Sequence, residues 1–136
     1  MNDFLGPASA VTSPARPVWR LQRAAAQLIV ALILIQAFLA GRFLFGGWTI
    51  TVHGIIGNAT FAVAAVLAVV ALVRRTDLVA VLTPVALALL LTAQIGLGYA
   101  GRTSMGAAAW HIPGGVLSFG IAVYLASRRE AGSPSR

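Results

Sequence analysis

Residues 50–73 read ITVHGIIGNATFAVAAVLAVVALV, an unbroken run of 24 positions whose one ionisable side chain is His53. A helix needs about 20 predominantly apolar residues to cross the hydrocarbon core of a bilayer. The run lacks the strict alternation of apolar and polar residues that a transmembrane β-strand shows. It is therefore predicted to be a membrane-spanning helix.

Three further apolar runs of similar length occur at about residues 24–44, 78–100 and 107–126. The chain is 59% hydrophobic and only 10% charged, whereas a soluble domain carries about 25% charged residues. A signal peptide is a competing interpretation of the first run, but the apolar core of a signal peptide is about 7–15 residues long. Because the connections between the runs are short, we expect an all-α, up-down bundle of four membrane-spanning helices.

The arginines predict how the bundle is oriented. All ten cations are arginine, and four spans place eight of them on one side of the membrane. These eight are Arg16, Arg20, Arg23, Arg74, Arg75, Arg128, Arg129 and Arg136. Only Arg42 and Arg102 fall on the other side. Since cytoplasmic loops carry an excess of basic residues, both termini are expected on the cytoplasmic side of a bacterial inner membrane.

The same reasoning divides the chain into three parts. Residues 1–18 are expected to form a flexible cytoplasmic tail, residues 19–129 the transmembrane domain, and residues 130–136 a disordered cytoplasmic tail. The net charge of +7 is spread over loops and tails and is not gathered on one face, so no nucleic-acid partner is expected. The chain has no cysteine, which excludes thiolate metal sites, iron–sulfur clusters and covalently attached c-type haem.

A shift of 58 residues aligns the two halves of the chain without gaps. Gln36 then falls on Gln94 and His53 on His111, although the chain holds only two histidines and four glutamines. Further matches are Gly57 with Gly115, Thr60 with Ser118, and Phe61 with Phe119. Chance remains an alternative. A real repeat would make the chain two tandem helical hairpins related by a pseudo-two-fold axis along the membrane normal.

The two histidines are expected to meet inside the bundle, near its non-cytoplasmic end. His53 lies about one turn inside the second run and His111 about one turn inside the fourth. Those two helices run in the same direction and are diagonal partners in an up-down bundle, and bundle interiors hold cofactors and metals. Two imidazoles, one from each side, would be the axial ligands of a six-coordinate b-type haem. The alternatives are a structural polar pair, another metal site or a proton relay, although ionisable residues within a membrane are functional candidates by default.

Small and aromatic residues follow each histidine at helical spacing. Gly57 and Gly115 lie one turn further along the faces that carry the histidines, where the lack of a side chain would let a flat macrocycle approach. Close helix packing is the alternative explanation. Phe61 and Phe119, one turn beyond the glycines, are candidates for the wall at the ring edge, or else ordinary core or lipid-facing residues.

Two further pairs are candidates for a supporting role. Arg42 and Arg102, in the predicted outer loops, are within reach of haem propionates, with interfacial anchoring as the alternative. Gln36 and Gln94 are expected to form hydrogen bonds between helices, or otherwise to contact a metal-ligating side chain or a quinone.

The motifs His53-Gly-Ile-Ile-Gly57 and His111-Ile-Pro-Gly-Gly115 resemble those of a group of small uncharacterised bacterial four-helix membrane proteins. Members of that group carry His-x-x-x-Gly on helix two and His-x-Pro-x-Gly on helix four, and the resemblance covers roughly residues 22–129. The arrangement is also similar to one half of haem A synthase and to four-helix b-type cytochromes, which implies a haem-binding bundle.

The resemblance does not imply the chemistry of the synthase. In the synthase pattern an acidic residue precedes the first histidine by one turn and an arginine follows it. This chain has Ile50 and Gly54 at those places.

The expected function is that of a membrane electron-transfer protein or subunit that binds one haem b. Its expected partners are the lipid bilayer and either a quinone or a respiratory membrane complex, with an oligomer as a further possibility. The main alternative is a cofactor-free structural or accessory subunit of a larger complex. A stand-alone enzyme is not favoured, because the predicted spans hold no Asp, Glu or Lys and any chemistry would be that of a cofactor.

Overall fold

The structure is a computed structural model that describes residues 16–47, 49–75 and 77–128. It contains four helices, α1 (Arg16–Leu44), α2 (Ile50–Arg74), α3 (Leu78–Ala100) and α4 (Met105–Ser127). Each is long and apolar enough to span a membrane. The predicted spans are confirmed. α2 and α4 extend beyond their apolar runs by one to three residues, and α1 begins eight residues before its run.

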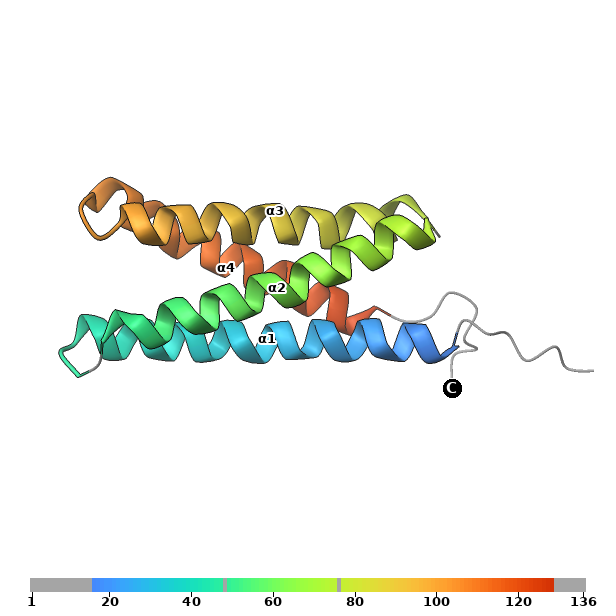
Figure 1. Cartoon of the computed structure of the whole chain (residues 1–136), viewed down its shortest axis with the longest axis horizontal. Coiled ribbons are helices and arrows are strands. Elements are labelled where there is room, and N and C mark those ends of the chain that lie inside the picture. The colour runs from blue at the N-terminus through green and yellow to red at the C-terminus, as the bar shows by residue number, and fades with distance from the viewer. Residues whose placement is uncertain (1–15, 48, 76, 129–136) are drawn as a thin grey trace, which may run out of the picture.

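The helices form the predicted up-down bundle (Figure 1). α1 and α3 each pack against both α2 and α4. The diagonal pairs are therefore α1 with α3 and α2 with α4. α1 begins at Arg16, so residues 16–18 of the predicted N-terminal tail are helical. The rest of that tail and the predicted tail at residues 130–136 lie outside the described residues.

Polar side chains cap the N-termini of α3 and α4. Asp77 is the N-cap of α3, and its carboxylate accepts a hydrogen bond from the backbone N–H of Ala80 at 2.7 Å. Ser104 caps α4 in the same way by accepting from Ala107. Both caps satisfy a helix N–H that would otherwise lack a partner. Asp77 also lies 3.6 Å from the guanidinium of Arg128, which links the start of α3 to the end of α4.

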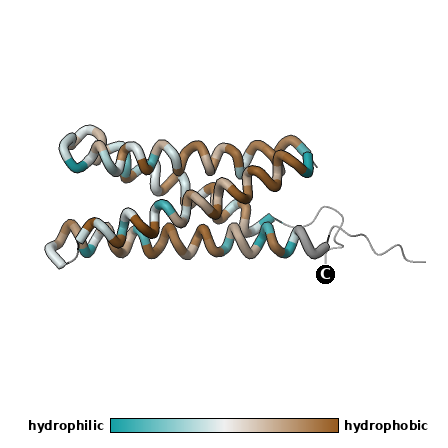
Figure 2. Tube along the Cα trace, in the orientation of Figure 1, coloured by the Kyte–Doolittle hydropathy of each residue, from teal (hydrophilic) through white to brown (hydrophobic). Residues whose placement is uncertain are grey.

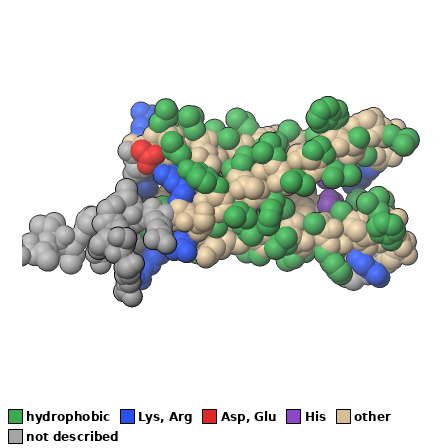
Figure 3. Space-filling model, turned by 180° about the vertical axis from the view of Figure 1, so that it is seen from behind, with side chains coloured by type: hydrophobic (Ala, Val, Ile, Leu, Met, Phe, Trp, Pro, Cys, Tyr) green, Lys and Arg blue, Asp and Glu red, His purple; other side chains and the backbone are tan. Residues whose placement is uncertain are grey.

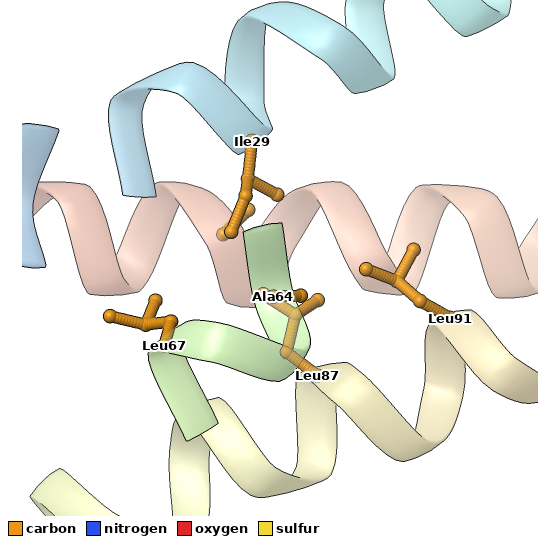
Figure 4. Packing of buried hydrophobic residues seen from close by; sticks show 6 residues of the cluster. Ile29, Ala64, Leu67, Leu87 and Leu91 are labelled. Atoms are coloured by element: carbon orange, nitrogen blue, oxygen red, sulfur yellow. The ribbon is translucent and has the colours of Figure 1, made fainter. Parts of the chain in front are cut away.

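The core consists of apolar residues from all four helices, packed around the middle of the bundle (Figure 4). Its members are Ile29, Ala64, Leu67, Leu87, Leu91 and Ala122, and we call them the core cluster. Many other large apolar side chains point outwards, among them Leu89 and Val66. An exposed apolar surface of this extent suits a lipid environment, because lipid tails are as apolar as the core itself.

Two pairs of core residues that are 58 positions apart in the sequence are buried to the same extent. Ile29 and Leu87 are both 0% exposed, and so are Ala64 and Ala122. Each pair is separated by the offset that aligns the two histidines. Equivalent residues of the two hairpins therefore occupy equivalent places in the packed interior, which is what a parallel structural repeat produces.

The two ends of the bundle differ in polarity (Figure 2). In α2 and α3 the residues of the half next to their connection are mostly apolar, whereas polar residues and glycines interrupt the half at the other end. That second half contains both histidines. A well-packed apolar half thus supports a looser, more polar half.

Candidate functional site

A cavity of about 490 Å³ lies in the polar half of the bundle. All four helices line it, and the lining includes both histidines, Gln36, Gln94, Gly57 and Gly115. It extends from Arg102, in the α3–α4 connection, to the level of Ser118. The space-filling view shows a histidine side chain in a hollow near this end of the molecule (Figure 3). The volume falls within the about 300–1,000 Å³ that is usual for small-molecule and cofactor sites.

His53 and His111 face each other across this cavity. Their ring centroids are 6.1 Å apart, and the ring planes are inclined by 62°. His53 comes from the first turn of α2 and His111 from the second turn of α4. The structure therefore brings the two imidazoles together from the diagonal pair of helices, as the topology predicts.

The ring of His53 is held by the neighbouring helix α1. Its Nδ1 lies 3.2 Å from the backbone carbonyl oxygen of Gln36. A carbonyl oxygen can only accept, so Nδ1 carries the proton in this contact. Nε2 then keeps its lone pair, which is the form of histidine that binds a metal ion.

The ring of His111 has no such hydrogen bond. Its Nδ1 is buried and has no hydrogen-bond partner within the described part of the chain. The ring lies against the backbone of Gly98 on α3, where a Cβ would approach Cε1 of His111 to 3.3 Å. The two histidines thus share a position in the repeat but differ in how firmly they are held.

The amide side chains of Gln36 and Gln94 point into the bundle over glycines. A Cβ at Gly57 would collide with the amide of Gln36, and a Cβ at Gly114 would collide with the amide of Gln94. Oε1 of Gln36 and Nε2 of Gln94 are buried without a hydrogen-bond partner among the described residues. Among the residues that the structure describes, these amides form none of the expected hydrogen bonds between helices, and the backbone of Gln36 makes the observed one instead.

Of the glycines in the two histidine motifs, Gly57 has a specific packing role, because it gives space to the amide of Gln36. A Cβ at Gly115 would lie 3.8 Å from Oε1 of Gln94, which is an ordinary contact. Both also line the cavity. The space beside the histidines is thus partly filled by the glutamine amides and is otherwise open.

The remaining candidates divide into those at the cavity and those away from it. Arg102 lines the cavity, and its guanidinium lies over the ring of Tyr99 at 4.7 Å. Arg42 belongs to the last turn of α1 and not to a loop, and its guanidinium lies beside Gly47. Phe61 packs against the core cluster and Phe119 is half-buried. Arg42 and both phenylalanines are outside the cavity lining.

Sequence reasoning missed Gly98, Gly114 and Tyr99. Gly98 and Gly114 contact His111 and Gln94, two residues that the sequence does single out. The signal that could have identified these glycines is their position opposite a polar side chain inside the bundle. Using it requires the relative rotation of α3 and α4, which the sequence does not supply.

No protein-family model, curated protein or solved structure matches the chain. Any function must therefore be inferred from the site itself. Within the described residues there is no group of three or more histidine, cysteine, aspartate or glutamate side chains that could hold a metal ion. The site offers two imidazoles, three side-chain amides, one guanidinium and three hydroxyls in a cavity that is otherwise lined by apolar residues and glycines. The amides belong to Gln36, Asn58 and Gln94, and the hydroxyls to Thr60, Tyr99 and Ser118.

Proposed function

We propose that the protein binds one haem b between His53 and His111 and transfers electrons within the membrane. The observation that carries the proposal is the separation of 6.1 Å between the two ring centroids. Metal–imidazole nitrogen bonds are about 2 Å long, so two imidazoles on opposite sides of one metal ion have centroids about 6 Å apart. The spacing suits two axial ligands of a single iron.

The number of ligands favours a macrocycle over a bare ion. A structural zinc site takes four protein ligands, and this cavity supplies two imidazoles and no thiolate or carboxylate from the described residues. A porphyrin brings four nitrogen ligands of its own and leaves two axial positions for the protein. Two facing histidines complete that set.

The residues of the cavity would each have a defined task. When bound, haem supplies a one-electron redox centre. The carbonyl of Gln36 fixes the orientation of His53 and leaves its Nε2 free to bind, as outer-shell carbonyls do for metal-bound histidines. Arg102 offers a guanidinium to propionates at the mouth of the cavity. The core cluster closes the opposite end and keeps it dry.

The position of the cavity suggests where electrons would be exchanged. The site lies toward the end with the α1–α2 and α3–α4 connections, which the arginine distribution predicts to be non-cytoplasmic. We propose a membrane quinone or a respiratory membrane complex as the partner on that side, in a bacterial inner membrane. With both axial positions filled by protein, electron transfer is the activity that the site supports best.

The test is spectroscopic and uses the full chain purified from haem-replete cells. We expect a Soret band and a reduced-minus-oxidised spectrum typical of low-spin haem with two imidazole ligands. The double variant His53→Ala/His111→Ala should be colourless. Val116→Ala is the control, because Val116 is also on α4, is 69% exposed and lies outside the cavity lining; this variant should keep its haem.

Two results would count against the proposal. A well-folded, colourless wild-type preparation would favour the alternative, a cofactor-free accessory subunit. Haem that persists in the double variant would show that these histidines are not the ligands.

A further inference from the structure

The two facing histidines are unequal. Nδ1 of His53 donates to the carbonyl of Gln36 at 3.2 Å, while Nδ1 of His111 is buried without a partner among the described residues. The 58-residue repeat makes Gln94 the counterpart of Gln36, yet His111 forms no equivalent bond. One imidazole is anchored to its neighbouring helix, and the other is not.

An anchored imidazole is the better metal ligand. Outer-shell hydrogen bonds fix the tautomer and the ring orientation of metal-binding histidines, and their loss lowers metal affinity by about 10–100-fold. His53 has that support and His111 lacks it. A metal ion bound between them would therefore release His111 first.

The surroundings of His111 also differ from those of His53 at the position next to the ring. Its ring lies against Gly98, whereas the position equivalent to Gly98 in the first hairpin is Ala40. Both positions line the cavity. Glycine at position 98 lets the ring of His111 pack directly against the backbone of α3, and Nδ1 of the ring still has no hydrogen-bond partner among the described residues.

We infer that His111 is an exchangeable ligand and that the site takes up a small neutral diatomic gas on the α4 side, in place of His111. This inference rests on the proposed binding of haem. The exchange breaks the bond from iron to Nε2 of His111 and forms one bond from iron to the gas. Both ligands donate one electron pair, so the oxidation state of the iron does not change and no proton is required. The chain would then bind gas as well as transfer electrons.

The experiment uses carbon monoxide with the reduced, purified full-length protein, and its matched variants are His53→Ala and His111→Ala. These positions are equivalent in the repeat, so the chemical change is the same in both. We expect the wild type to form a carbon monoxide adduct, seen as a shifted Soret band. His111→Ala should keep its haem and bind the gas faster, because no protein ligand has to leave. His53→Ala should lose haem, with an affinity about 10–100-fold below that of His111→Ala.

A second measurement on the wild type does not depend on either variant folding. Diethyl pyrocarbonate modifies free imidazole nitrogens, and the chain has only two histidines. After reduction and addition of carbon monoxide, peptide mass mapping should find modified His111 and protected His53. Without carbon monoxide, both rings should be protected.

The outcomes separate this inference from the proposed function. A wild type without a Soret band overturns both, and this is seen before any gas is added. A wild type that binds haem but forms no adduct overturns the gas site alone. Equal haem loss in the two single variants, or modification of His53 in the adduct, also contradicts the assignment of His111.

Discussion

Thr60 and Ser118 make the same hydrogen bond in the two hairpins. Thr60 donates its hydroxyl to the carbonyl of Ile56 at 2.7 Å, and Ser118 donates to the carbonyl of Gly114 at 2.8 Å. Both residues are 1% exposed and lie 58 positions apart. A hydroxyl that bonds to the carbonyl four residues earlier is satisfied within its own helix, so these two polar groups can be buried without a partner from another helix.

The two hairpins are most alike in the core and least alike at the end of the bundle that contains the cavity. Two pairs of equivalent residues in the core cluster, Ile29 with Leu87 and Ala64 with Ala122, are fully buried, but His53 and His111 differ in their hydrogen bonds. Packing of an apolar core constrains both hairpins in the same way, because each must fill the same interior. The cavity imposes no such constraint, and here the two halves differ.

Core packing gives the first prediction. Ile29→Ala and Leu87→Ala should destabilise the bundle by similar amounts, about 1–3 kcal/mol each, because both leave a void in the core cluster. This is less than the about 2–5 kcal/mol seen in soluble cores, since lipid solvates apolar groups as well as the core does. Unfolding in mixed micelles measures the change.

The control for that experiment is Leu89→Ala, at a position that is 67% exposed. It should change the free energy of unfolding by less than about 0.5 kcal/mol. A cost for Leu89→Ala as large as for Leu87→Ala would mean that this outward face is packed against another protein and not against lipid.

The four helices could be predicted from the sequence because the relevant signals are local. An apolar run of about 20 residues specifies a span by its length alone, and short loops specify antiparallel neighbours. The start of α1 was harder to predict. The helix begins at Arg16, before the apolar run. Polar residues are mixed with apolar ones in this segment, so hydropathy gives no signal for the start of the helix.

The candidate site could be predicted in part. Topology places His53 and His111 on diagonal helices at one depth, and the structure brings them to 6.1 Å. The roles of Phe61 and Arg42 depend on how each helix is rotated about its own axis. The sequence does not determine this rotation, because each helix is similarly apolar on several faces. For the same reason the contact between the Gln94 amide and Gly114 was not predictable. Haem binding stays a prediction.

The close approach of Gln94 to Gly114 gives the second prediction. Gly114→Ala should destabilise the protein by about 1–3 kcal/mol, because the new methyl group must displace a buried amide. Gly120→Ala is the control, since a Cβ there meets nothing within 4 Å. It should be neutral or stabilising by up to about 1 kcal/mol, the difference in helix propensity between glycine and alanine.

A double variant tests the cause of that effect. Replacing Gln94 by alanine removes the amide, so Gly114→Ala should cost less in the Gln94→Ala background than in the wild type. Thermal unfolding of the four proteins completes the cycle. Strictly additive costs would show that Gly114 is needed for a reason unrelated to Gln94.

The two outer arginines give the third prediction, which depends on the proposed haem. Arg102 lines the cavity and Arg42 does not. Arg102→Ala should weaken haem binding about two- to fivefold, the effect of losing a partly exposed ion pair of about 0.5–1 kcal/mol. Arg42→Ala should leave haem affinity unchanged. Haem transfer to apomyoglobin measures both, and the loss at Arg102 should shrink as salt screens the pair.

The orientation of the bundle gives the fourth prediction. Eight arginines flank one side of the four spans and two flank the other, so the α3–α4 connection is expected outside the cytoplasm and the end of α4 inside it. The chain has no cysteine, so single cysteines can be introduced without first removing others. Thr103 and Ser127 are suitable positions, because both are exposed at opposite ends of the bundle.

In intact cells a membrane-impermeant maleimide should label Thr103→Cys and leave Ser127→Cys unlabelled. Permeabilised cells should show both labelled, which controls for the reactivity of each position. The reverse pattern would place the histidine cavity at the cytoplasmic face. The electron partner would then have to be sought on that side, while the geometry of the histidine pair would be unaffected.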